Sequence, residues 1–159
     1  MIRIAESQYQ NSKTMTLQLS ALILLDQYNE EERHPFLQKF IDTYQNNPLV
    51  IMKYLTLVGN SNHPKVVENI RKVQKESLYQ ENLPNHAKAL FGTFSRNLEF
   101  FHKKDGSGYE LLTDFILEID TINPHTAARM AGAFKLYPKL STECQEIMRP
   151  YLEKIYKRE

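Results

Sequence analysis

Apolar residues along this 159-residue chain recur every three or four positions, the spacing of one face of an α-helix. No segment shows the strict apolar–polar alternation, or the run of β-branched residues, that predicts a strand. The pattern therefore predicts an all-α protein. The series run through Leu17, Ala21, Leu24, Leu25 and Tyr28; Phe36, Phe40 and Tyr44; Ile51, Tyr54, Leu55 and Val58; Val66, Ile70 and Val73; Tyr109, Leu112, Ile116 and Ile119; and Cys144, Met148, Tyr151 and Ile155.

Proline and capping residues divide these series into helices. Proline is tolerated in a first helical turn, because its missing N–H needs no partner there. Asn47 and Asn123 each precede such a proline, and we expect their side-chain oxygens to cap the exposed amides. Ser141 is expected to open the last helix in the same way. The prolines predicted to start helices are Pro48, Pro64, Pro84 and Pro124.

Pro150 falls inside the last predicted helix. There it removes one backbone hydrogen bond and its ring clashes with the carbonyl of Glu146. We expect either a kink or an early end to the helix at this point.

The divisions give roughly eight helices joined by short loops. Successive antiparallel pairs of this kind favour a HEAT- or armadillo-like curved stack, in which each pair buries its apolar face on its neighbours. A compact helical bundle fits the periodicity almost equally well, because no recurring sequence unit is visible.

Composition limits the classes of function. Hydrophobic residues make up 42% of the chain and charged residues 25%, which is typical of one folded domain, residues 1–159. Twenty basic and nineteen acidic side chains leave a net charge of +1, which gives no reason to expect a nucleic-acid or membrane partner. The longest apolar run, 21–25, is too short to span a bilayer. The single cysteine, Cys144, suits a cytoplasmic protein.

The chain has no recognisable catalytic centre. A zinc peptidase of the gluzincin type needs His-Glu-x-x-His on one helix, and none of the five histidines has another within five residues. Cys144 is predicted to be a buried apolar residue rather than a nucleophile. Asp105 and Ser107 lie in a glycine-containing turn and are predicted to cap the next helix. We therefore predict no catalytic residue, no metal site and no activity for this chain alone.

Two segments carry a resemblance to a known family: residues 101–109, Phe-His-Lys-Lys-Asp-Gly-Ser-Gly-Tyr, and residues 123–129, Asn-Pro-His-Thr-Ala-Ala-Arg. The segments 14–25, 47–54 and 63–70 align in the same order. In these segments the chain resembles the C-terminal helical domain of bacterial aminopeptidase N, a zinc-dependent alanyl aminopeptidase. That domain is an all-helical superhelix, so the resemblance favours the curved stack over the bundle.

The resemblance also implies a role. In such enzymes this domain closes over a thermolysin-like catalytic domain, which holds the zinc, and encloses a chamber for peptide substrates. In these enzymes the arginine that matches Arg129 faces the chamber. So does the residue that matches His125, which is commonly a glutamine in the family. Lys88 matches a chamber-lining arginine, and lysine keeps the charge without the bidentate geometry. Without the resemblance, the sequence predicts that Arg129 is an ordinary surface arginine.

The resemblance thus implies a chamber-forming domain whose partners are the catalytic and other domains of the same polypeptide and the peptide substrate. Release of N-terminal amino acids would then depend on zinc held outside this chain. A stand-alone helical-repeat module that binds another protein remains the alternative. The two hypotheses differ in whether the reading frame continues upstream through a His-Glu-x-x-His motif.

Overall fold

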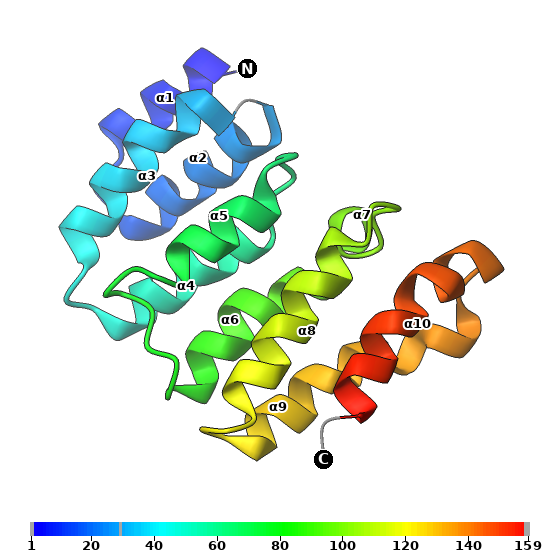
Figure 1. Cartoon of the computed structure of the whole chain (residues 1–159). Helices are drawn as coiled ribbons and strands as arrows, with labels where there is room; N and C mark the ends of the chain where they lie inside the picture. Colours follow the sequence, from blue (N-terminus) through cyan, green and yellow to red (C-terminus); the bar gives the residue numbers. More distant parts are fainter. Residues whose placement is uncertain (1, 29, 158–159) are drawn as a thin grey trace.

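The computed structural model describes residues 2–28 and 30–157, and it leaves out the side chains of residues 27–34. All elements within these residues are helical, and they lie side by side from one end of the molecule to the other (Figure 1). The elements are α1 (Ile2–Asn11), α2 (Met15–Tyr28), α3 (Glu30–Tyr44), α4 (Pro48–Gly59), α5 (Val66–Val73), α6 (Pro84–Phe94), α7 (Leu98–Phe101), α8 (Ser107–Ile119), α9 (Pro124–Ala131), the 3₁₀ helix η1 (Gly132–Lys139) and α10 (Thr142–Tyr156).

The predicted helix starts are largely confirmed. Asn47 accepts a hydrogen bond from the Leu49 amide at the start of α4, at 3.1 Å between Oδ1 and N. Asn123 accepts one from the Thr126 amide at 3.0 Å and so caps α9. Ser141 opens α10 by accepting from the Cys144 amide. The prediction for Pro64 is wrong by two residues, because Pro64 lies in a turn and α5 begins at Val66.

Two rows of helices form the larger part of the stack. The α4–α6–α9 row consists of α4 packed on α6, and α6 packed on α9. The α5–α8–α10 row lies against it, through contacts of α5 with α4, of α8 with α9, and of α10 with η1. The main core fills the space between the rows, and a stacked ring pair, Phe91 on α6 and Phe115 on α8, lies in it with centroids 3.8 Å apart.

A second core closes the N-terminal end, where α1, α2 and α3 pack together and α3 contacts α4. Its buried members include Tyr9, Leu22, Phe40 and Leu57, so it joins α1, α2, α3 and α4. Both cores agree with the predicted apolar series in most helices. The series Val66, Ile70, Val73 and the series Tyr109, Leu112, Ile116, Ile119 are buried throughout.

Several predicted details are wrong. Leu17 and Leu24 are exposed. Helix α2 packs against both α1 and α3, so the face that it buries includes Leu22 instead. The all-α prediction of roughly eight helices agrees with the described residues, in which α1 and the short α7 are the additional α-helices. Cys144 is only partly buried.

Two further details concern prolines. The helix that begins at Pro124, as predicted, ends at Ala131, and the chain continues as η1. Pro138 lies within η1; it has no N–H, and in an α-helix its ring would clash with the carbonyl of Phe134. Pro150 does not end α10, which continues to Tyr156. None of the described helices has the length and apolar character needed to cross a membrane.

Candidate functional site

The three residues predicted to line a chamber lie on two neighbouring helices of one row. Lys88 is on α6, and His125 and Arg129 are one turn apart on α9. All three side chains are exposed, and none forms an ion pair or hydrogen bond with another described residue. The structure therefore brings Lys88 onto a helix next to the one that carries Arg129, and it leaves their charges free.

Gly92 shows how closely these helices approach. A Cβ atom added to Gly92 would lie 3.7 Å from Lys88 Cγ and 3.7 Å from Met130 Cε. The stem of Lys88 on α6 and the side chain of Met130 on α9 therefore flank the same point. Since Met130 follows Arg129 directly, Lys88 and Arg129 belong to helices that approach each other closely at Gly92.

The α4–α6–α9 row contains no acidic residue. Its three helices carry the cations Lys53, Lys88 and Arg129 and no Asp or Glu, and η1, which follows α9, adds Lys135 and Lys139. Each of these five side chains is exposed, and none pairs with an acid among the described residues. Unpaired cations with no acidic neighbours on their own helices produce a positive potential over this row.

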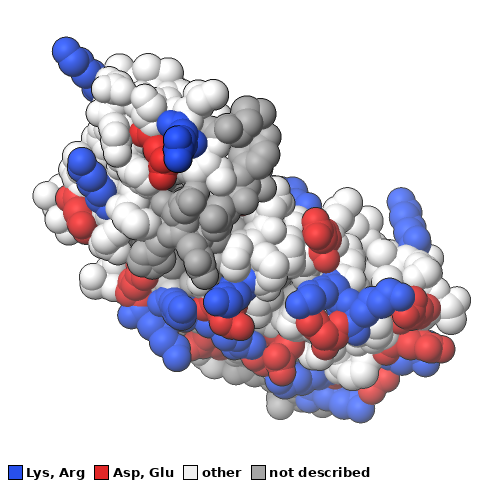
Figure 2. Space-filling model, turned by 90° about the horizontal axis from the view of Figure 1, so that it is seen from above, with Lys and Arg blue, Asp and Glu red and all other residues white. Residues whose placement is uncertain are grey.

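The α5–α8–α10 row has the opposite arrangement, in which acids and bases pair. Arg71 on α5 lies 3.1 Å from the Asp114 carboxylate on α8, and Lys154 on α10 lies 3.1 Å from the other oxygen of Asp114. Figure 2 shows basic and acidic side chains interleaved along the lower edge of the view. The chain's net charge of +1 thus conceals an uneven distribution between the two rows.

Two of the described histidines, His86 and His102, are engaged in hydrogen bonds within the protein. Burial lowers the pKa of His86, whose Nδ1 accepts a hydrogen bond from the Gln80 amide at 3.1 Å. Burial also lowers the pKa of His102, whose Nδ1 lies 2.8 Å from the Tyr109 hydroxyl. Within residues 2–28 and 30–157, no group of three or more His, Cys, Asp or Glu side chains is placed to hold a metal ion.

The turn before α8 is structural, but its N-cap is Gly106, which has no capping side chain, and Ser107 is the first residue of the helix rather than its cap. Asp105 Oδ1 accepts hydrogen bonds from the Ser107 amide at 2.9 Å and from the Ser107 hydroxyl at 2.6 Å. These bonds, with Lys103 2.9 Å away, lower the pKa of Asp105 to about 2. The segment is thus a structural turn.

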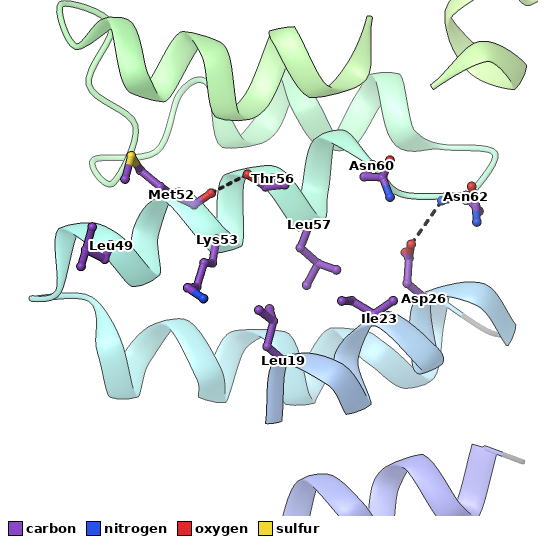
Figure 3. A pocket seen from close by; sticks show the side chains of 10 residues that line it. All are labelled: Leu19, Ile23, Asp26, Leu49, Met52, Lys53, Thr56, Leu57, Asn60 and Asn62. Carbon is purple, nitrogen blue, oxygen red and sulfur yellow. Dashed lines mark hydrogen bonds between the residues drawn. The ribbon is translucent and has the colours of Figure 1, made fainter. Parts of the chain in front are cut away.

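A pocket that no sequence pattern predicts lies between α2 and α4 (Figure 3). Asp26, from α2, is buried there and accepts hydrogen bonds from the Ser61 hydroxyl at 2.7 Å and the Asn62 amide at 3.2 Å. Asp26 and Ser61 are 35 positions apart, so no local spacing reveals their contact. Lys53 also lines the pocket. In the sequence it is noted only as a member of segment 47–54, which aligns with the aminopeptidase N domain.

Comparison with known proteins defines the family. Residues 1–159 match the family model described as a domain of unknown function (DUF3458_C) with ARM repeats. The chain belongs to this family, and the ARM-repeat description agrees with the observed stack of helices.

The chain is also similar to a part of longer proteins. It is 29% identical over 153 residues to aminopeptidase N of Haemophilus influenzae, and 28% identical over 153 residues to aminopeptidase N of Escherichia coli. Each alignment covers 96% of this chain and 18% of the relative, so the chain spans about a fifth of the length of these enzymes. The homology is to their C-terminal region.

A solved structure has the same fold. The crystal structure of Legionella pneumophila aminopeptidase A in complex with aspartic acid superposes with a TM-score of 0.93 at 29% sequence identity. The match covers 98% of this chain and 18% of that one.

Proposed function

We propose that this chain is the C-terminal domain of a zinc aminopeptidase that releases N-terminal amino acids from peptides. In this proposal it covers the catalytic domain of the same polypeptide and lines the substrate chamber with its α4–α6–α9 row. Its partners are the other domains of that enzyme and the peptide, and the enzyme works in the cytoplasm. Family membership and the aminopeptidase relatives support the class of enzyme.

The observation that carries the chamber role is the absence of acids from the α4–α6–α9 row. A peptide bound by its amino end extends its carboxyl end away from the metal, and that end is an anion. Exposed cations without acidic partners attract such an anion, and an enclosed space with little water strengthens the attraction. Lys88, His125 and Arg129 are the residues that we assign to this role.

Zinc itself is assigned to the catalytic domain. The donor sets within the described residues do not fit it, and the sequence has no His-Glu-x-x-His. No chemical step is therefore assigned to this chain, whose residues would bind and orient the part of the peptide beyond the scissile bond.

The test uses Arg129 in the full-length enzyme. Arg129→Ala should raise KM for tri- and tetrapeptides about three- to tenfold and leave KM for single-residue amides unchanged, because only the longer substrates reach this row. Arg129→Lys, which keeps the charge but loses the bidentate fork, should lie between.

Lys72→Ala is the matched control, since Lys72 is an exposed cation on α5 in the other row. It should leave both substrate classes unaffected. Equal effects of Arg129→Ala on long and short substrates would contradict the assignment. A reading frame that starts at Met1 with no zinc motif upstream would instead favour a stand-alone interaction module.

A further inference from the structure

The pocket between α2 and α4 has the size and lining of a small-ligand site. Its volume is about 390 Å³, within the range of roughly 300–1,000 Å³ that is usual for such sites. Figure 3 shows side chains from both helices converging on it, Leu19 and Ile23 from α2 and Leu57 from α4. The apolar part of the lining consists of Leu19, Ile23, Leu49, Met52 and Leu57.

The apolar lining continues to the rim, where it is open to water. Leu49 is 65% exposed and Ile23 is 44% exposed, whereas Leu57 at the base is 6% exposed. An apolar group that enters the pocket would cover these side chains and gain free energy from the area removed from water. The pocket therefore suits an aliphatic or aromatic side chain.

Two polar side chains of the pocket already have partners within the protein. The carboxylate of Asp26 accepts from Ser61 and Asn62, and the hydroxyl of Thr56 donates to the Met52 carbonyl at 2.8 Å. The exposed ammonium group of Lys53 has no ion pair or hydrogen bond with another described residue, and neither have the exposed side-chain amides of Asn60 and Asn62. The pocket thus contains one carboxylate, Asp26, which is buried and already accepts two hydrogen bonds, and one cation, Lys53, which is free to pair with a ligand.

We infer that this pocket binds an apolar amino-acid residue with a free α-carboxylate, such as the last residue of a peptide. The side chain enters between Leu19, Ile23 and Leu57, and the carboxylate accepts from Lys53 Nζ. An ammonium group beside an apolar cavity matches this chemistry, since it pairs with the carboxylate while the side chain leaves water.

The inference does not rest on the proposed peptidase role, because the pocket and Lys53 belong entirely to this chain. It adds a site on α4, a helix of the row proposed to line the chamber, whereas the residues assigned to the chamber role lie on α6 and α9.

Titration of the ¹⁵N-labelled 159-residue chain followed by NMR tests the inference. N-acetyl-L-leucine should shift the backbone amides of Ile23, Met52 and Leu57 in a saturable manner. N-acetyl-L-leucinamide, which has the same side chain but no charge, should bind about fivefold more weakly. N-acetylglycine, which has the charge but no side chain, should produce no saturable shift.

Variants separate the two parts of the site. Lys53→Gln should weaken binding of N-acetyl-L-leucine to the level of the amide, while Lys139→Gln, an exposed cation on η1, should leave it unchanged. Ile23→Ser should weaken binding of both ligands. Equal affinity for acid and amide in the unmodified chain would overturn the inference and indicate a purely apolar docking groove. Absence of any saturable shift would overturn it too.

Discussion

At the scale of single residues, the turn before α8 depends on two glycines. Gly106 has φ of 75°, and it is the only described residue with a positive φ. Side chains other than hydrogen are strained in this left-handed region. Gly108 is needed for a different reason, since an added Cβ would lie 2.6 Å from the Phe100 carbonyl oxygen. This turn explains the glycine-containing motif without any phosphate-binding role.

Gly106→Ala should lower the free energy of unfolding by about 1–3 kcal/mol, because it adds backbone strain and places a Cβ 2.9 Å from the Tyr151 hydroxyl. Gly132→Ala is the control, since Gly132 has a right-handed φ of −56° and no atom within 4 Å of the added Cβ. It should be neutral or stabilising by up to about 1 kcal/mol. Urea denaturation of both variants checks this, and equal losses would contradict it.

At the scale of elements, local signals predict where helices begin better than they predict which residues become buried. Asn47, Asn123 and Ser141 cap helices as predicted, because a cap depends only on residues two or three positions away. Leu24 is exposed because contacts with distant helices decide the rotation of α2. Local signals do not predict the pocket between α2 and α4 either, because its two walls are distant in sequence.

A second element-level feature is the attachment of the segment before α6. His86 is 4% exposed, and its Nδ1 accepts the Gln80 amide, so the neutral ring holds this segment against α6. Burial lowers the pKa of His86 in the folded state. As pH falls, His86 therefore binds a proton in the unfolded chain at a higher pH than in the folded protein. Its contribution to stability is lost as pH falls from the unfolded pKa of about 6.5 toward the lower folded pKa.

The free energy of unfolding should therefore fall less between pH 7.5 and pH 5.5 in His86→Gln than in the unmodified chain. Urea denaturation at both pH values measures this difference. His125→Gln, which alters an exposed histidine on α9, should keep the original pH dependence. An unchanged pH dependence in His86→Gln would show that the buried ring does not titrate on unfolding.

At the scale of the whole molecule, the helices stack side by side, and within the described residues no three His, Cys, Asp or Glu side chains are placed to hold a metal ion. The ARM-type fold agrees with the sequence prediction, because helical periodicity and family resemblance both depend on residues spread over the entire chain. The assignment of Lys88, His125 and Arg129 to a chamber is still a prediction. It depends on domains that lie beyond this sequence in the relatives, of which the chain covers 18%.

The 159-residue chain by itself should not hydrolyse alanine p-nitroanilide, with or without added zinc, because it lacks the paired histidines and glutamate that hold and use the metal. Release of p-nitroaniline, followed by absorbance, measures this. Turnover that a chelator abolishes would show that the chain carries its own metal centre.

The separation of charge between the two rows has a consequence for the isolated molecule. With a net charge of +1, it is nearly neutral at pH 7, yet helices α4, α6 and α9 carry only cations, whereas the α5–α8–α10 row carries paired ions of both signs. Such a molecule has a permanent electric dipole across the stack. The electric field of an approaching anionic molecule will orient the protein before contact, so that α4, α6 and α9 face the anion first.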